Sequence, residues 1–228
     1  MIDIHTHVLP FVDDGSDSLE KSISLIKALY ESGVTDIVCT PHLRANYRAT
    51  AKEVLDAFNL TKTAVEKENI PVRLHLGREL YVSKHYKDNI VKFDATMLGS
   101  KYVLVEFDFG FMCEVTETVY ELVTAGYIPI VAHPERYDYM TFDDALEVKH
   151  MGGLLQLNAD SILSSPLSRR KRFAVKLFKN DLVDFVASDV HFGRENRLQR
   201  AKAYVSAKFG KDVASKVFNE NAKKIIEG

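Results

Sequence analysis

Apolar and polar residues follow two rhythms along this chain, with short β-rich runs alternating with longer segments of helical periodicity. Several short runs are continuously apolar, including Tyr102–Val105 and Ile128–Val131, as expected for parallel strands covered on both faces. The predicted strands are Met1–His7, Thr35–Pro41, Val72–Leu76, Tyr102–Phe107, Ile128–Ala132, Leu154–Leu157 and Asp184–Ser188. The predicted helices are Leu19–Ser32, Ala51–Glu68, Val115–Ala125, Phe142–Met151, Pro166–Asn180, Glu195–Phe209 and Lys211–Glu220.

This alternation of strands and helices predicts an α/β fold with right-handed crossovers and a parallel sheet. Seven predicted strands favour a closed or nearly closed barrel, and a doubly wound sheet is the alternative. No linker, low-complexity segment or repeat divides the sequence, so we expect a single domain over residues 1–228.

Composition narrows the classes of partner and compartment. The chain has 30 Lys+Arg against 32 Asp+Glu, a net charge of −2 that argues against a nucleic-acid partner. Two cysteines, Cys39 and Cys113, are too few for a disulfide scaffold and are typical of a reducing compartment. No apolar run approaches the ~18 residues of a membrane helix, and the first residues do not resemble a signal peptide. We therefore expect a soluble, cytoplasmic protein without direct membrane insertion.

Side chains that bind metals follow most of the predicted strands. They are His5, His7, His42, Glu79, Glu106, His133, Asp189 and His191. Taken singly, each has an ordinary explanation, although Glu106 ends the apolar run Tyr102–Val105 and is expected to be partly buried, where a carboxylate needs a cation or several donors. Because parallel strands place their C-terminal ends together, the set predicts a multinuclear metal site of imidazole and carboxylate ligands. A ligand set without thiolate disfavours structural zinc and suits manganese, iron or catalytic zinc.

Clustered metals of this kind suit the hydrolysis of phosphate esters. Arg136 and Arg194 each follow a candidate histidine ligand by three residues, and a guanidinium binds phosphate bidentately. A solvent-facing loop position is the alternative for either arginine. Phe109 and Phe111 could form an aromatic rim for a ring-bearing substrate, with core packing as the alternative for at least one of them.

The motifs together resemble those of the PHP (polymerase and histidinol phosphatase) family. The matching segments are Asp3-Ile4-His5-Thr6-His7, Asp13-Asp14-Gly15, Thr40-Pro41-His42, Gly77-Arg78-Glu79, Glu106, Ala132-His133-Pro134-Glu135-Arg136-Tyr137 and Ser188-Asp189-Val190-His191. Within the family, the sequence is most similar to the manganese-dependent tyrosine-protein phosphatases of capsule and exopolysaccharide operons in Gram-positive bacteria. The resemblance spans essentially the whole chain and implies a distorted (βα)7 TIM-like barrel.

The resemblance also implies a site for three divalent metal ions, manganese being expected and iron or zinc the alternatives. Its motifs assign one ion to His5, His7, Glu79 and Asp189. They make Glu79 a bridge to a second ion that Glu106 and His133 also hold, and they assign the third to Asp14, His42 and His191.

For the reaction, the resemblance implies a protein-tyrosine phosphatase acting on the tail of a bacterial tyrosine kinase that controls polysaccharide export. Our hypothesis is that a metal-bound hydroxide attacks phosphotyrosine in line while Arg136 and Arg194 hold the phosphoryl group. The loop after His191 is shorter than in relatives, so Arg197 is the alternative to Arg194. His42 or Asp189 could assist the departure of the phenolate, whose pKa of about 10 demands little help.

Other functions make different demands on the sequence. A histidinol-phosphate phosphatase or another small-molecule phosphoesterase would use the same site. A PHP-type nuclease would need a basic groove, and a metal-stabilised regulatory protein would bind metal without turnover. A cysteine-dependent phosphatase needs the pattern Cys-x5-Arg, but Arg44 lies one residue too close to Cys39, and Cys113 is followed by Val119 at the required position.

Overall fold

The computed structural model describes residues 1–227, and its strands pair in parallel throughout. The strands are β1 (Ile2–Thr6), β2 (Asp36–Cys39), β3 (His42–Leu43), β4 (Arg73–Leu76), β5 (Glu79–Tyr81), β6 (Tyr102–Glu106), β7 (Ile128–Ala132), β8 (Leu154–Asn158) and β9 (Phe185–Ala187). Each of the seven predicted strands is confirmed to within two residues at either end. The two shortest strands, β3 and β5, were not predicted.

These two additions arise because two barrel strands are interrupted. Cys39 pairs with Leu76, and His42 pairs with Glu79, so the same register runs through both interruptions. Thus β2 and β3 together form one interrupted strand of the barrel, and β4 and β5 together form the next. Within the second interruption, the buried guanidinium of Arg78 donates hydrogen bonds to the backbone carbonyls of Pro41, His42 and Ala49. The interruptions therefore place His42 and Glu79 on strands rather than after them.

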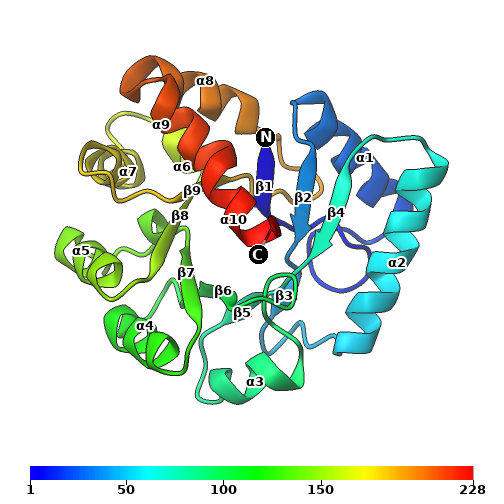
Figure 1. The fold of residues 1–228 in the computed structure, drawn as a ribbon, viewed down its shortest axis with the longest axis horizontal. Coiled ribbons are helices and arrows are strands. Elements are labelled where there is room, and N and C mark those ends of the chain that lie inside the picture. The colour runs from blue at the N-terminus through cyan, green and yellow to red at the C-terminus, as the bar shows by residue number, and fades with distance from the viewer. Residues whose placement is uncertain (228) are drawn as a thin grey trace.

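The barrel closes between its first and last strands, β1 and β9. Thr6 forms a parallel bridge with Val190. The amide of Asp189 donates to the carbonyl of His5 over 3.0 Å, and the amide of His7 donates to the carbonyl of Val190 over 3.1 Å. Together with the other pairings, these contacts give a barrel of seven parallel strands in sequence order, with each interrupted strand counted once (Figure 1). The predicted (βα)7 barrel is confirmed, and the doubly wound alternative is wrong.

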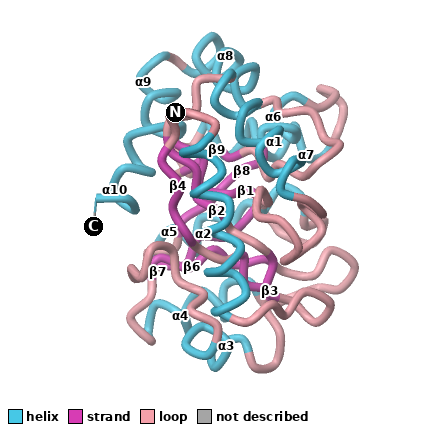
Figure 2. The backbone as a smooth tube through the Cα atoms, turned by 90° about the vertical axis from the view of Figure 1, so that its right-hand side faces the viewer, coloured by secondary structure: helices cyan, strands magenta, loops and turns pink. Residues whose placement is uncertain are grey.

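Helices surround the barrel (Figures 1 and 2). They are α1 (Leu19–Glu31), α2 (Ala51–Lys67), α3 (Tyr86–Lys92), α4 (Val115–Thr124), α5 (Phe142–His150), α6 (Ala159–Leu163), α7 (Arg169–Lys179), α8 (Leu198–Phe209), α9 (Lys211–Ser215) and α10 (Asn221–Glu227), with a 3₁₀ turn at Pro134–Arg136 and a π-helical turn at Lys216–Glu220. Two predicted helices start later than expected, at Arg169 and Leu198. The short helices α3 and α6 carry too few residues to show a clear period and were not predicted. Within residues 1–227, no helix is both long and apolar enough to cross a bilayer.

The C-terminal helix seals one end of the barrel. The predicted last helix ended at Glu220, but the chain continues through the π-helical turn into α10. Ala222 and Ile225 of α10 are buried among side chains of the barrel interior such as Ile4 and Ile130. Figure 1 shows α10 crossing this end of the ring. Because this end holds the starts of the strands, their C-terminal ends are left open for chemistry.

Candidate metal centre

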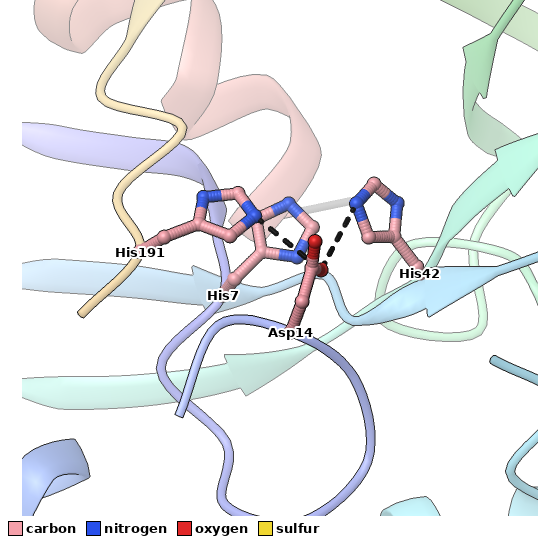
Figure 3. Close-up of side chains that lie close together, drawn as sticks. All are labelled: His7, Asp14, His42 and His191. Atoms are coloured by element: carbon pink, nitrogen blue, oxygen red, sulfur yellow. Dashed lines mark ion pairs between the residues drawn. The ribbon is translucent and has the colours of Figure 1, made fainter. Parts of the chain in front are cut away.

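The structure brings all nine predicted metal ligands together at the C-terminal ends of the strands. They form four overlapping groups whose ligand atoms lie within 4.8 Å of one another: His7, Asp14, His42 and His191; His5, His7 and Asp189; His5, Glu79 and His133; and His42, Glu79 and Glu106. Figure 3 shows the first group, with Asp14 between His42 and His191. All nine side chains except Asp14 belong to buried residues. We call this cluster the metal centre.

Glu79 occupies the middle of the metal centre. Its Oε1 lies 3.3 Å from His5 Nε2 and 3.1 Å from His133 Nε2. Its Oε2 lies 3.3 Å from His7 Nε2 and 2.7 Å from His42 Nδ1. A carboxylate shared by four imidazoles is placed as a bridging ligand would be, as the family resemblance implies.

The pKa values of the buried groups show an environment crowded with like and unlike charges. Burial alone would raise the pKa of Glu79, but the imidazoles of His5 and His42 hold it well below its usual range. Burial and the neighbouring Glu79 raise the pKa of Glu106 to about 8. Burial lowers the pKa of His133 to about 4, which leaves its imidazole neutral. A neutral imidazole is the form that binds metal.

Two candidate ligands lie at sharp backbone turns that follow their strands. His133 follows β7 with a φ of 35°, and Asp189 follows β9 with a φ of 51°. Both values lie in the left-handed region, which side chains other than glycine rarely adopt. Strain of this kind persists where the surrounding structure fixes it, and it clusters at functional sites. Here the turns direct both side chains into the metal centre.

The turn Asp13–Gly15 delivers Asp14 and also orients a histidine. Asp13 Oδ2 contacts His7 Nδ1 at 2.7 Å and accepts a hydrogen bond of 2.9 Å from the amide of His42. This contact leaves His7 Nε2 facing the ligand cluster. A Cβ on Gly15 would lie 2.1 Å from the carbonyl oxygen of His7, so only glycine lets the turn approach so closely. From the sequence, Asp13 was identified only within the Asp13-Asp14-Gly15 motif, and its contact with His7 was missed.

Strand β8 supplies no candidate ligand, but it supports two of them. Gln156 Oε1 lies 2.8 Å from His5 Nδ1, and Gln156 Nε2 donates to Asn158 Oδ1 over 2.9 Å. Asn158 Nδ2 then donates to Asp189 Oδ2 over 2.7 Å. This buried chain fixes His5 with its Nε2 toward the centre. The sequence signal was only that the end of this strand carries amides in place of imidazoles.

Two arginines reach the metal centre. Arg136 Nη1 lies 3.1 Å from Asp189 Oδ2, as expected from its position after His133. Arg44, which sequence reasoning considered only as part of a cysteine motif, lies 3.6 Å from Asp14 Oδ2 through Nη2 and 3.8 Å from Glu106 Oε2 through Nη1. Its position two residues after His42 was the available signal.

The other two candidate arginines lie farther out. Arg194 is exposed, and its backbone amide donates to the carbonyl of His191. Arg197 Nε lies 2.8 Å from Glu195 Oε2 and 3.5 Å from Asp160 Oδ1. Neither side chain forms an ion pair with a candidate ligand within residues 1–227, although burial, helped by the Arg194 charge, lowers the pKa of His191.

Phe109 packs against the centre, whereas Phe111 does not. The guanidinium of Arg136 lies over the Phe109 ring at 4.4 Å, and the same ring lies 5.6 Å from that of His133. Phe109 is 41% exposed and Phe111 is 77% exposed. Asp108 fixes this loop because its Oδ1 accepts hydrogen bonds from the amides of Gly110 and Phe111. Phe109 thus forms an aromatic wall beside Arg136, in line with the expected rim.

The donor set of the centre fits divalent metal ions. Glu106 Oε2 is buried and has no hydrogen-bond partner within residues 1–227. An unpartnered buried carboxylate oxygen is costly unless a cation neutralises it. Imidazole and carboxylate ligands without thiolate suit manganese, iron or catalytic zinc.

Comparison with known proteins identifies relatives along nearly the whole chain. The family model described as capsular polysaccharide synthesis, CpsB/CapC, matches residues 1–227. The tyrosine-protein phosphatase CpsB of Streptococcus agalactiae is 33% identical and aligns over 100% of this chain and 98% of its own length. The putative tyrosine-protein phosphatase CapC of Staphylococcus aureus is 34% identical over 84% of this chain and 77% of its own length.

Solved structures give the same fold. A chain from a study of YwqE of Bacillus subtilis and CpsB of Streptococcus pneumoniae, described as unique metal-dependent tyrosine phosphatases, superposes with a TM-score of 0.86. It is 28% identical, and the match covers 94% of this chain and 90% of that one. Histidinol phosphate phosphatase of Lactococcus lactis shares the fold at 13% identity, with a TM-score of 0.60 over 92% of this chain and 93% of that one.

Proposed function

This chain belongs to the CpsB/CapC family of capsular polysaccharide synthesis, and from that premise we propose that it is a metal-dependent protein-tyrosine phosphatase. The observation that carries the proposal is the metal centre, in which nine imidazole and carboxylate side chains meet at the open end of the barrel. Similar relatives are named tyrosine-protein phosphatases. Phosphate monoester hydrolysis is the chemistry that such a centre supports best.

The proposed substrate is phosphotyrosine in the tail of a bacterial tyrosine kinase. The relatives' names supply the phosphotyrosine, and the family's link to capsular polysaccharide synthesis favours a kinase that controls polysaccharide export. Such a kinase uses ATP, so the phosphatase would act in the cytoplasm.

The proposed cofactors are three divalent ions, with manganese expected and iron or zinc as alternatives. His5, His7, Glu79 and Asp189 would hold one ion, and Asp14, His42 and His191 another. Glu79 would be shared with an ion held by Glu106 and His133. When bound, the ions neutralise phosphoryl oxygens and make water acidic enough to act as a nucleophile near neutral pH.

Side chains of the protein would bind and orient the substrate. Arg136, held over Phe109 and beside Asp189, would bind the phosphoryl group with its planar fork. Arg44 faces the opposite carboxylates, Asp14 and Glu106, and would contact the same group from the other side. Arg194 would join them only if its loop moved inward. The Phe109 ring would form a wall for the phenyl ring of the substrate, because aromatic rings pack favourably on one another.

A thiolate mechanism does not fit this site. Cys39 is fully buried, and burial raises the pKa of its thiol well above the usual value. Its side chain also belongs to the main hydrophobic core rather than to the metal centre. A buried thiol held in its protonated form is a poor nucleophile.

The test is hydrolysis of a phosphotyrosine peptide after removal of metal with a chelator. We expect activity to fall about 100-fold or more and to return on addition of manganese, iron or zinc. Histidinol phosphate serves as the competing substrate in parallel reactions. Full activity in a metal-free sample would refute the metal-dependent mechanism, and a higher kcat/KM for histidinol phosphate would refute the assignment to phosphotyrosine.

A further inference from the structure

A cavity of about 820 Å³ lies beside the metal centre and has no part in the chemistry described above. Its walls come from three segments: residues 10–13, residues 45–49, and the face of α2 that carries Glu53, Asp56, Ala57 and Leu60. We call it the side pocket. Its volume exceeds that of a phosphoryl group, so it has room for a further part of a substrate.

The side pocket adjoins the metal centre through two shared loops. The first loop carries Asp13 on the pocket wall and Asp14 in the centre. In the second loop, reciprocal backbone hydrogen bonds of 3.1 and 2.9 Å between Arg44 and Tyr47 close a tight turn. Arg44 reaches the centre from this turn, while Tyr47 lines the pocket and stacks on His42 with ring centroids 6.0 Å apart. These shared loops place the pocket next to the metal centre.

The pocket presents apolar side chains to solvent at a strained backbone position. Phe11 is 71% exposed and has a φ of 66°, in the left-handed region that an aromatic residue rarely adopts. Its amide donates to the carbonyl of Ser16, so the loop holds this conformation. Leu60, on the opposite wall, is 47% exposed. Large exposed apolar side chains beside a cavity are typical of a binding surface.

The charged side chains on the pocket walls are already engaged by other groups of the chain. Glu53 and Asp56 lie on its α2 wall, with Arg48 in the loop wall. Glu53 is already engaged in capping α2, since its Oε2 accepts a hydrogen bond from the amide of Thr50. Asp56 Oδ2 pairs with Lys52 Nζ over 2.5 Å, and the Arg48 guanidinium lies over the Phe93 ring at 5.8 Å. An uncharged apolar side chain would contact Phe11, Leu60 and Ala57 without breaking these pairs.

We propose that the side pocket binds an apolar side chain next to the phosphotyrosine in the substrate protein. This inference rests on the proposed function and deepens it, because it makes the enzyme selective for the sequence around the phosphotyrosine. The occupant is the substrate chain itself, since the pocket and the metal centre share the loop at Asp13–Asp14 and the turn at Arg44–Tyr47.

The test compares two substitutions on one helix. Leu60→Glu places a charge in the side pocket, and Leu55→Glu is the matched control because Leu55 lies on α2, is also 47% exposed and does not line this pocket. Phe11→Asn is the second pocket variant, since asparagine tolerates a left-handed φ. The substrates are a phosphotyrosine peptide with leucine on both sides, the same peptide with aspartate there, and para-nitrophenyl phosphate.

We expect wild type to prefer the leucine peptide, because burying one leucine side chain is worth about tenfold in binding. In Leu60→Glu and Phe11→Asn, the ratio of leucine-peptide kcat/KM to para-nitrophenyl phosphate kcat/KM should fall about tenfold. In Leu55→Glu the ratio should stay within about twofold of wild type, as for a surface substitution. Equal ratios in Leu60→Glu and Leu55→Glu would overturn the proposal.

A binding measurement separates this inference from the proposed function. The Kd of the leucine peptide is measured with phosphotyrosine replaced by a non-hydrolysable phosphonate analogue, so no turnover is needed. If wild type hydrolyses no phosphate ester, the proposed function fails, and the side pocket is then judged on binding alone. A Kd raised about tenfold in Leu60→Glu but not in Leu55→Glu would support the pocket, and equal values would refute it.

Discussion

The two ends of the barrel each bury a carboxylate near basic side chains, but only one of the two carboxylates has hydrogen-bond donors for both of its oxygens. At the N-terminal end, Asp36 accepts hydrogen bonds from Arg73 Nε over 2.6 Å and from Thr35 Oγ1 over 2.9 Å, and it lies 3.0 Å from His75 Nε2. At the C-terminal end, Glu106 Oε2 has no hydrogen-bond partner within residues 1–227. A carboxylate with all its donors in place stabilises the fold, whereas one without them favours the binding of a cation. Carboxylates therefore stabilise the fold at one end and, by our proposal, bind metal at the other.

The largest expected effect comes from changing the C-terminal end. We predict that Glu106→Gln lowers kcat for para-nitrophenyl phosphate about 100-fold or more, because it removes the charge of a proposed metal ligand. The free energy of unfolding of the metal-stripped protein at pH 8 should not fall, since the substitution removes a carboxylate that burial and Glu79 disfavour. Steady-state kinetics and urea unfolding measure the two quantities. A large loss of stability with little loss of activity would contradict this prediction and would show that Glu106 stabilises the fold, as Asp36 does.

The matching substitution at the N-terminal end should affect stability alone. We predict that Asp36→Asn lowers the free energy of unfolding by about 1.5 kcal/mol, a modest value because Arg73 is 74% exposed. Burial would raise the pKa of Asp36, but Arg73 and His75 lower it overall. Folding therefore favours the ionised carboxylate, and its contribution, present at neutral pH, is lost as the pH falls through the lowered folded-state pKa.

Urea unfolding of wild type and Asp36→Asn at pH 7, 4 and 3 tests this prediction, and the difference between them should shrink toward the lowest pH. Activity at pH 7 should match that of wild type. A difference in stability that grows as the pH falls would show that the contacts of Asp36 have been misread.

A smaller effect distinguishes the arginines around the open end. We predict that Arg44→Ala raises the inhibition constant of inorganic phosphate about fivefold, because Arg44 lies beside Asp14 and Glu106. Arg194→Ala should change it less than about twofold, since Arg194 is exposed in this conformation. Competitive inhibition with para-nitrophenyl phosphate as substrate gives both constants. A larger effect at Arg194 would mean that its loop closes on the bound phosphate.

The smallest expected effect concerns the buried thiol between the two ends. Cys39→Ser should leave kcat/KM for the phosphotyrosine peptide within about twofold of wild type at a temperature where both proteins are folded. Thermal unfolding by circular dichroism fixes that temperature. Loss of turnover in a folded, metal-loaded Cys39→Ser protein would restore the thiolate mechanism.

Much of the barrel and the ligand set could be predicted from the sequence. Continuous apolar runs such as Ile128–Ala132 identify buried parallel strands because both faces of such strands need cover. Once the strands are parallel in a barrel, His5, His133 and Asp189 must approach one another, since each follows or ends a strand at the same end. Short elements were missed because β3 has only two residues, too few for any period to appear.

Thus the amino-acid sequence by itself determined the fold class and the types of candidate ligand at the strand ends. Only the tertiary structure decided how those ligands are aimed and what surrounds them. Asp13 orients His7 while binding the amide of His42, 29 positions away, and Gln156 contacts His5 across 151 positions. Arg44 and the side pocket likewise depend on loops that meet only in the folded chain. Local periodicity reflects burial along one segment, whereas orientation and cavities arise from contacts between segments far apart in sequence.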